Sequence, residues 1–285
     1  MHALSDEALD AALRAFLAED TGRLDVTTAA TVPASARARG ELVAKSDCVA
    51  SGLPVARRVF ELLEPDLTWK DEVAAGTRVG RGAVLARLEG RARPILTAER
   101  VALNLVQRMS GIAMTTRRFV DALAGTGCRV LDTRKTAPGL RALDKYAVLC
   151  GGGENHRIGL YDMFLVKNNH IDRAGSIEEA VARIRRRGLS QKIMVEVRSM
   201  AELDQALALA PDFILLDNMS VGDMRAAVEH AAGRVPLEAS GGITLENVRA
   251  IAETGVDRIS IGAITHSVKA LDISMQIEPV APRLP

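Results

Sequence analysis

A run of basic side chains lies between residues 131 and 170 of a chain whose formal net charge is only +1. The run contains Arg134, Lys135, Arg141, Lys145, His156, Arg157 and Lys167. It begins after one short apolar segment and ends after another, and Pro138–Gly139 and the glycines 151–153 predict turns between them. Cations at strand ends beside glycine loops suit a small polyanionic ligand. Ordinary surface charges are the alternative, but these cations cluster at strand ends and not along one helix face.

Two acids occupy apolar strands further along the chain. Glu196 lies within IMVEV, and Asp217 ends the segment FILLD. A lone acid in an apolar strand is unfavourable unless it is paired or hydrated, so both acids should point into a polar cavity. There they could hold Mg²⁺, directly or through water, or bind ribose hydroxyls. The structural alternative is a salt bridge to Lys167 or Lys135.

Glycines follow two later apolar runs. Ser240–Gly241–Gly242 precedes a helix, and Gly262–Ala263 repeats this arrangement one unit later. Glycine lets backbone N–H groups approach a phosphate, and the N-terminus of the next helix favours the anion. His156 and Arg157 follow three glycines, a position that favours anion binding over a purely structural histidine. His266 could donate to a phosphate or only cap its own segment.

Repeated strand–helix units position these side chains. After Gly125, six apolar runs each end at or near a polar or glycine position: Arg134, Lys167, Glu196, Asp217, Ser240 and Gly262. The last four positions are 21 to 23 residues apart, which is the length of one strand, one helix and two loops. Such units form a parallel sheet with function at the carboxyl ends of the strands. Six units are too few for a closed eight-stranded barrel.

The first 109 residues predict an α+β domain. The expected elements are a helix at Leu4–Leu17 capped by Ser5, strands within Arg37–Ser51, a helix at Leu53–Leu63, hairpins within 67–96, and helices at Thr97–Met109 and Met114–Leu123. With Thr97 as the N-cap, Arg100 would lie in the first turn, where the helix dipole disfavours a cation. Most arginines at such a position are only solvated, and a carboxylate ligand is the alternative. We place the domains at 1–109 and 110–267, with the tail 268–285 joining the first.

Composition narrows the classes of function. Hydrophobic residues make up 48% and aromatic residues 3% of the 285-residue chain, so aliphatic packing fills the core and no base-stacking surface is expected. The near-neutral charge provides no global field for nucleic acid or an anionic membrane. Three widely spaced cysteines argue against a disulfide framework and a thiolate zinc site. With no leader and no apolar run of membrane length, we expect a soluble cytoplasmic protein.

Several motifs, in one order, resemble the quinolinate phosphoribosyltransferase family. They are DVTT from Asp25, LTAER ending at Arg100, DTRKTxPGxR from Asp132, KYAV from Lys145, GGGxNHRxGL from Gly151, KxNH from Lys167, LLDN from Leu215, SGGI from Ser240 and GAITHS from Gly262. The resemblance implies an α/β fold in which an N-terminal α+β domain precedes an open, incomplete, six-stranded α/β barrel. It implies transfer of a phosphoribosyl group from phosphoribosyl pyrophosphate to quinolinate, with Mg²⁺ and with release of pyrophosphate and CO₂. It also implies a homodimer in which each first domain covers the partner's barrel.

The resemblance assigns roles to the residues singled out above. Carboxylate binding falls to Arg100, Arg134, His156 and Arg157, charge neutralisation to Lys135 and Lys167, ribose and Mg²⁺ binding to Glu196 and Asp217, phosphate binding to Ser240, Gly241 and Gly262, and further substrate contacts to Thr133 and His266. Among these, Lys135, Lys167, Glu196 and Asp217 are the expected catalytic residues.

The chain departs from the family pattern at three positions. Asn168 replaces the usual Asp after Lys167, and Met194 and Arg198 replace acids two residues before and after Glu196. Each change removes negative charge near the expected metal region. Two other functions stay open. One is a paralogue with a different substrate, which the motifs TRKTAPG and NHR disfavour, and the other is a non-catalytic phosphosugar-binding protein that keeps the barrel.

Overall fold

The computed structural model describes residues 5–280 and divides into two compact units, which are taken separately below. The first unit contains the residues up to 115, the segment 137–152 and the residues from 268 onward. The second contains residues 116–136 and 153–267. The boundary expected near 110 and the division after 115 both fall inside one helix, which spans Ala92–Ala122. The segment 137–152, expected in the barrel domain, groups with the first unit.

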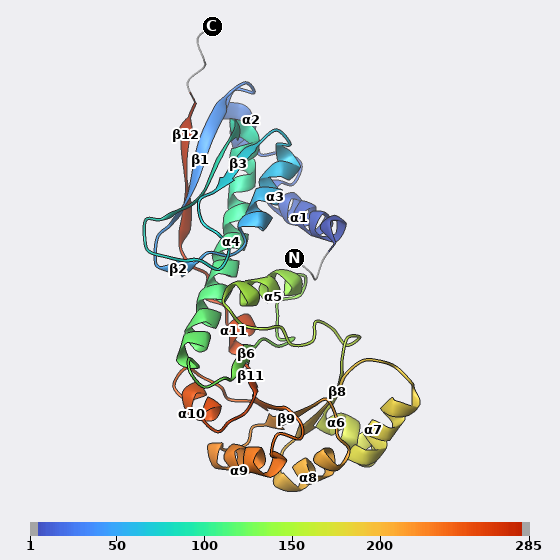
Figure 1. Ribbon diagram of the computed structural model, residues 1–285. Coiled ribbons are helices and arrows are strands. Elements are labelled where there is room, and N and C mark those ends of the chain that lie inside the picture. Colours follow the sequence, from blue (N-terminus) through green and yellow to red (C-terminus); the bar gives the residue numbers. More distant parts are fainter. Residues whose placement is uncertain (1–4, 281–285) are drawn as a thin grey trace. The chain divides into compact units, whose positions relative to one another are not determined.

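A four-stranded antiparallel sheet in the order β12-β1-β5-β3 is the framework of the first unit (Figure 1). Its strands are β1 (Arg37–Ala44), β3 (Thr68–Asp71), β5 (Val84–Arg91) and β12 (Ile273–Pro279), and β2 (Cys48–Val49) and β4 (Arg78–Val79) form a separate short pair. The helices are α1 (Asp6–Thr21), α2 (Val26–Thr31), α3 (Leu53–Leu63), α4 (Ala92–Ala122) and α5 (Arg141–Cys150). The bounds predicted for α3 are confirmed, and Ser5 caps α1 as predicted, with its hydroxyl accepting the N–H of Ala8 at 3.3 Å. Leu4, the expected first residue of α1, lies outside the described residues.

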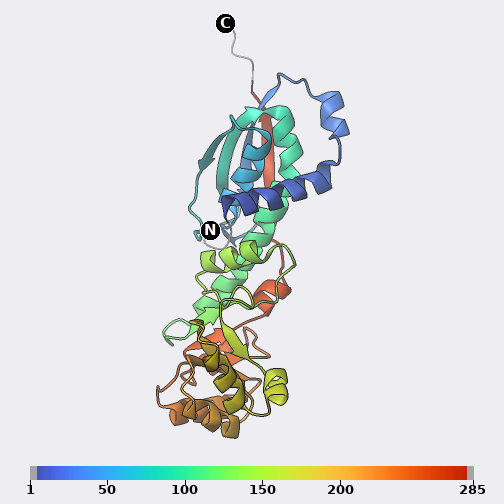
Figure 2. The same ribbon diagram turned by 90° about the vertical axis from the view of Figure 1, so that its right-hand side faces the viewer.

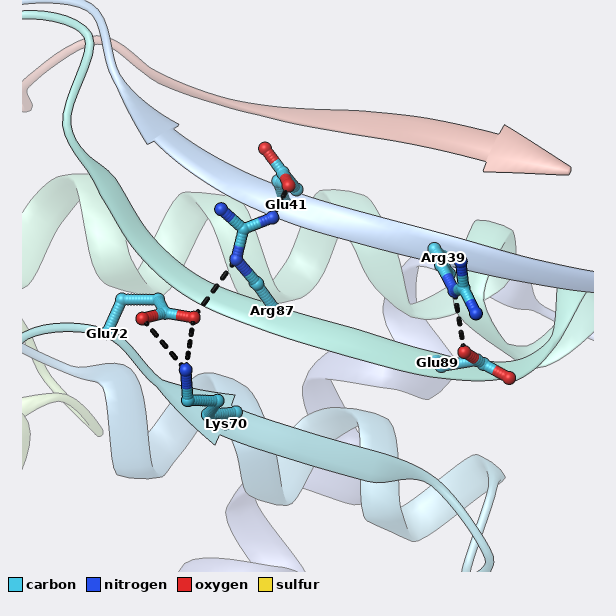
Figure 3. Close-up of polar contacts among 6 residues, drawn as sticks. All are labelled: Arg39, Glu41, Lys70, Glu72, Arg87 and Glu89. Atoms are coloured by element: carbon cyan, nitrogen blue, oxygen red, sulfur yellow. Dashed lines mark hydrogen bonds and ion pairs between the residues drawn. The ribbon is translucent and has the colours of Figure 1, made fainter. Parts of the chain in front are cut away.

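Charged side chains cover the face of this sheet that points away from the helices (Figure 3). Arg39 pairs with Glu89 at 2.7 Å. The carboxylate of Glu72 accepts hydrogen bonds from Lys70 at 2.9 Å and from Arg87 at 3.0 Å. An exposed ion pair contributes at most about 1 kcal/mol, so burial of the opposite face must hold the sheet together. The charges also discourage this surface from pairing with another sheet.

Helix α4 is one continuous helix of 31 residues, although the sequence predicted two helices separated near Ser110–Gly111. The gap between the two predicted helices contains Gly111, and this glycine serves close packing. A Cβ atom at Gly111 would overlap the carbonyl oxygen of Lys269, in the segment that leads to β12. The prediction of two helices is therefore wrong, because a glycine within a helix can mark a close backbone contact instead of a helix end.

The start of α4 also changes the interpretation of Arg100. The helix begins at Ala92, so Thr97 is not its N-cap, and the Thr97 hydroxyl donates instead to the carboxylate of Asp25 at 3.1 Å. Arg100 is exposed and lies well inside the helix. The argument that the helix dipole disfavours a cation at this position therefore fails, because the dipole acts within the first turn.

Helix α5 is the second difference from the sequence prediction, which expected only turns between the two glycine-containing segments. Lys145 in this helix is fully buried, and the neighbouring Asp144 accepts two hydrogen bonds from Arg108 at 2.9 and 2.8 Å. Arg141 and Lys145 thus belong to the first unit and not to the cation group of the barrel. No helix among residues 5–280 combines the length and apolar character needed to cross a membrane.

Six parallel strands in the order β6-β11-β10-β9-β8-β7 form the second unit. They are β6 (Arg129–Leu131), β7 (Phe164–Val166), β8 (Ile193–Val197), β9 (Phe213–Asp217), β10 (Leu237–Ser240) and β11 (Arg258–Ser260). The helices are α6 (Asn168–Ala174), α7 (Ile177–Arg186), α8 (Met200–Ala208), α9 (Val221–Ala231), α10 (Val248–Ala252) and α11 (Ala263–His266). Helices α7 to α9 lie on the outer side of the strands (Figures 1 and 2). Within the described residues β6 and β7 do not pair with each other, so the expected open, six-stranded barrel is confirmed.

The register of the sheet determines which side chains face the barrel interior. Glu196 of β8 pairs with Leu215 of β9, and Leu215 pairs with Glu238 of β10. Ser240 pairs with Asp217 one layer further toward the carboxyl ends of the strands. Because paired residues of neighbouring strands project to the same side, all five side chains share one face. The acids therefore line the interior, and the strand ends bring their polar positions to one edge.

Candidate active site

A cavity of about 680 Å³ opens at the carboxyl ends of the barrel strands. All of its lining residues belong to the second unit. The predicted site residues among them are Thr133, Arg134, Lys135, His156, Arg157, Lys167, Glu196, Asp217, Ser240, Gly241, Gly262 and His266. Arg100 is the one predicted site residue that does not line this cavity. Residues that the sequence distributes over more than 130 positions thus meet at one end of the barrel.

Arg134 and Arg157 place two positive charges near each other in this cavity. Burial lowers the pKa of Arg157 below the usual arginine value, and the positive charge of Arg134 lowers it further. One guanidinium N–H of Arg157 donates to the carbonyl oxygen of Met163 at 3.2 Å. The Nε atom of Arg134 is buried and has no hydrogen-bond partner among residues 5–280. Two neighbouring positive charges in a partly buried site, together with an N–H donor that has no acceptor, favour the binding of a ligand with two negative charges.

Glu196 and Asp217 form the acidic part of the cavity. The ammonium group of Lys167 donates to Glu196 at 2.8 Å, and only 7% of the Glu196 side chain is exposed. The salt bridge considered as a structural alternative therefore exists, with Lys167 as its cation. Asp217 accepts a hydrogen bond from the side-chain amide of Asn218 at 3.1 Å. Within the described chain, no group of three or more His, Cys, Asp or Glu side chains could hold a metal ion.

The turn after β10 requires glycine. Gly241 has a φ of +95°, and a Cβ atom there would overlap the side-chain amide of Asn218. Asn218 itself has a φ of +54°, and its N–H donates to the carbonyl oxygen of Ser240 at 2.9 Å. The two turns after β9 and β10 therefore fit against each other. Such a glycine turn can present backbone N–H groups to an anion.

Gly262 has a role that the sequence did not indicate. A Cβ atom at this position would lie 2.9 Å from Cδ of Lys135 and 3.2 Å from the ring of His266. The hydroxyl of Thr265 also donates to the carbonyl oxygen of Lys135 at 2.9 Å. The absence of a side chain at Gly262 thus leaves room for the Lys135 side chain to pass over its Cα atom. It also leaves the backbone of Gly262 open to close approach by a ligand.

His156 is held at both its backbone and its ring. Its backbone N–H donates to the buried carboxylate of Asp132 at 2.8 Å. Its Nδ1 atom accepts the backbone N–H of Arg157 at 2.7 Å, and its Nε2 atom lies 3.3 Å from the carboxylate of Glu238. The ring nitrogens therefore face the protein, and only 8% of the side chain is exposed. This arrangement favours a positioning role over direct anion binding.

The three departures from the family pattern do not line the cavity. Met194 is almost completely buried, whereas Arg198 pairs with Glu202 of α8 at 2.9 Å. The side-chain oxygen of Asn168 is buried without a hydrogen-bond partner among the described residues. The loss of three acids relative to the family pattern thus changes the surroundings of the cavity but not its lining.

Further lining residues were not predicted from the sequence. They are Leu165, Leu215, Asn218, Gly242, Ile243, Thr244, Ser260 and Ala263. The signal that could have found them is the two-residue period of the strands, since Leu215 and Ser260 lie two residues before the predicted positions 217 and 262. Glu238, two residues before Ser240, faces the same interior by this rule but is fully buried and does not line the cavity.

Family comparisons agree with this architecture. The N-terminal domain of quinolinate phosphoribosyl transferase matches residues 25–110, and its C-terminal domain matches residues 112–276. A nicotinate-nucleotide pyrophosphorylase [carboxylating] from Mycobacterium leprae is 44% identical over 283 residues, which cover 96% of this chain and 100% of that protein. A chloroplastic protein of the same name from Oryza sativa subsp. japonica is 44% identical over 95% of this chain and 78% of its own length.

A solved structure supports the same grouping. The crystal structure of NadC from Streptococcus pyogenes superposes with a TM-score of 0.93 at 38% sequence identity, covering 97% of this chain and 99% of that one. The match includes the small first unit and the open barrel, so it concerns the whole architecture and not only the common α/β part. The chain belongs to the quinolinate phosphoribosyltransferase family.

Proposed function

We propose that this protein transfers the phosphoribosyl group of phosphoribosyl pyrophosphate to quinolinate, and that decarboxylation then gives nicotinate mononucleotide, with pyrophosphate and CO₂ as the other products. One observation carries the proposal. A single cavity combines two neighbouring arginines, a lysine–acid pair and a glycine turn. These three groups suit the dicarboxylate, the ribose with its pyrophosphate, and the 5′-phosphate. Family membership supports the same reaction.

Arg134 and Arg157 are the proposed carboxylate ligands. Their mutual repulsion in the free protein would be relieved by a 2,3-dicarboxylate, which carries two charges on adjacent ring atoms. A monocarboxylate such as nicotinate would neutralise only one of them. The site would therefore select quinolinate by charge count as well as by shape.

Glu196 and Asp217 would bind the ribose hydroxyls and, with them, Mg²⁺. The donor set fits this ion, because Mg²⁺ in phosphoryl-substrate sites is held by one or two carboxylates while phosphates and water complete its octahedron. Bound there, the ion would neutralise charge on the pyrophosphate leaving group. Ser240, Gly241 and Gly262 would bind the 5′-phosphate through backbone N–H groups.

The chain's own charges then favour the reaction. As pyrophosphate departs, the anomeric carbon becomes positive, and the carboxylates of Glu196 and Asp217 would stabilise it. Lys135 and Lys167 would neutralise the departing pyrophosphate. Once the pyridine nitrogen is ribosylated it is positively charged, so it stabilises the carbanion left at the adjacent carbon when CO₂ leaves. A proton from solvent then adds to that carbon and completes nicotinate mononucleotide. No covalent intermediate with the protein is required.

The decisive experiment is detection of nicotinate mononucleotide by mass spectrometry after incubation with quinolinate, phosphoribosyl pyrophosphate and Mg²⁺. Nicotinate, supplied instead of quinolinate, tests acceptor choice. Formation of nicotinate mononucleotide from nicotinate alone would indicate a paralogue with a different substrate. Binding of phosphoribosyl pyrophosphate without any product would indicate a phosphosugar-binding protein.

A homodimer with shared sites is the proposed assembly. The barrel mouth is lined by charged groups, and a second subunit could exclude water from it and supply Arg100 of the partner subunit. The test refolds a mixture of inactive Arg100→Ala and inactive Lys167→Ala chains. If the sites are shared, half of the random dimers have one intact site, which recovers roughly a quarter of wild-type activity. An inactive mixture of folded, exchanged dimers would refute shared sites.

We also propose that the enzyme acts in the cytosol, where its three free cysteines would stay reduced. Recovery of the protein in an exported or organellar fraction of its source cells would contradict this location.

A further inference from the structure

The carboxylate of Glu238 is buried beneath the cavity and has no place in the proposed chemistry. Glu238 is on β10, its side chain is 0% exposed, and it faces the barrel interior one layer below Ser240. Neither carboxylate oxygen makes a well-aligned hydrogen bond within residues 5–280. The polar contact of the carboxylate is with the ring of His156, whose Nε2 atom lies 3.3 Å away. A buried carboxylate is unfavourable unless it is paired, so this contact with His156 matters to both residues.

The contacts of His156 determine its tautomer. Because Nδ1 accepts the backbone N–H of Arg157 at 2.7 Å, this nitrogen must carry a lone pair. The ring proton of the neutral imidazole is then on Nε2, the nitrogen that faces Glu238. Loss of the Glu238 carboxylate would remove the electrostatic preference that it gives for a proton on Nε2. Glu238 therefore selects the form of His156 that can accept from Arg157.

We propose that Glu238 is a positioning residue for substrate binding, acting through His156 on Arg157. The path has two steps, from the Glu238 carboxylate to the imidazole and then to the Arg157 amide. Asp132 fixes the backbone of His156 separately, so the contribution of Glu238 is to the ring. The Arg157 guanidinium is thereby directed into the cavity beside Arg134. This proposal rests on the proposed function, because it assumes that Arg157 binds a substrate carboxylate.

The variants are Glu238→Met, which removes the oxygen atoms that face Nε2, and Glu238→Gln, which keeps one oxygen atom there. The matched control is Glu154→Gln, a nearby acid whose side chain is 47% exposed and pairs with Arg129. We expect Glu238→Met to weaken quinolinate binding about tenfold or more, measured by calorimetry, with phosphoribosyl pyrophosphate affinity within about twofold of wild type. Glu238→Gln and Glu154→Gln should both stay within about threefold.

Nitrogen-15 NMR of labelled histidine gives a readout that a merely structural role would not move. The His156 signal, assigned by its loss in His156→Gln, should show an Nε2-protonated neutral ring in the wild type. In Glu238→Met this pattern should change. Equal weakening of both substrates, or an unchanged His156 tautomer in Glu238→Met, would overturn the proposal.

The wild-type spectrum keeps the proposal testable even if Glu238→Met does not fold, since an Nδ1-protonated His156 would overturn it directly. The spectrum also separates this proposal from the proposed function. Wild-type protein that shows the expected tautomer but binds no quinolinate would refute the function, and would remove the positioning role with it. Wild-type protein that makes product while Glu238→Met binds quinolinate normally would refute the positioning role alone.

Discussion

Truncation of Arg134 to alanine tests the carboxylate site most directly. Its Nε atom is buried without a hydrogen-bond partner among the described residues, and its charge lowers the pKa of Arg157. In a partly dry site, loss of one charge-assisted contact costs about 2–5 kcal/mol. At about 1.4 kcal/mol per factor of ten, kcat/KM for quinolinate should fall roughly 30- to 5,000-fold.

Stability should behave differently from activity. The truncation removes a buried donor without an acceptor, worth about 1–3 kcal/mol, and also removes repulsion between two guanidinium groups. The same truncation removes the packing of the aliphatic part of the arginine side chain, which destabilises the fold by a similar amount. The melting temperature of Arg134→Ala should therefore stay within about 3 °C of wild type.

The assay compares steady-state kinetics with quinolinate, calorimetric binding of quinolinate and nicotinate, and thermal unfolding. Arg183→Ala is the matched control, because Arg183 is an exposed arginine of α7 that pairs with Glu179 at 2.7 Å. Its kcat/KM should stay within about twofold of wild type. An Arg134→Ala protein with kcat/KM within about threefold of wild type would refute the assignment. A melting temperature lowered by more than about 8 °C would show that Arg134 supports the fold instead.

Three further variants test other parts of the cavity. Lys167→Met should lower the free energy of unfolding by about 1–2 kcal/mol, because the mostly buried Glu196 loses its partner. The loss is this small because Lys167 is half-exposed, which weakens the ion pair, and an unchanged urea midpoint would contradict the prediction. Gly241→Ala should raise the KM for phosphoribosyl pyrophosphate about tenfold or more, because its φ of +95° and the Asn218 side chain exclude a Cβ; quinolinate affinity is the internal control, and equal losses would argue for general misfolding. Asn168→Asp should lower the Mg²⁺ concentration that gives half-maximal rate, and a magnesium titration without a shift would show that the position is structural.

The barrel and most of its site could be predicted because they follow from strand periodicity. Polar positions recur at the ends of apolar runs, and the carboxyl ends of parallel strands meet at one edge of a sheet. This is why Glu196, Asp217 and Ser240 meet around one cavity although they lie on three strands. The sequence could not show which cation pairs with Glu196, since Lys135 and Lys167 were equally plausible partners. That choice depends on side-chain reach within the folded barrel.

Three other features did not follow from the local signals. The gap expected between two helices contains Gly111, whose absent side chain admits the backbone of Lys269, more than 150 residues further along the chain. The helix α5 lies in a segment whose flanking glycines predicted only turns. The dipole argument for Arg100 depended on a first-turn position that disappeared once α4 proved to begin at Ala92, so the motif LTAER alone supports Arg100 as a ligand. For Gly111, a backbone contact distant in sequence outweighed the local signal.

The charge balance of the cavity connects its stability to its function. Arg134, Lys135, Arg157 and Lys167 face only two lining carboxylates, those of Glu196 and Asp217, so the free site carries excess positive charge. The pKa of Arg157 is lowered by burial and further by the positive charge of Arg134, so the charged form of Arg157 is held in an unfavourable state. Two neighbouring guanidinium groups in a partly buried site lower the stability of the free protein. A dianionic ligand would supply the missing negative charge, so we expect this pair to provide the main discrimination between quinolinate and monocarboxylates.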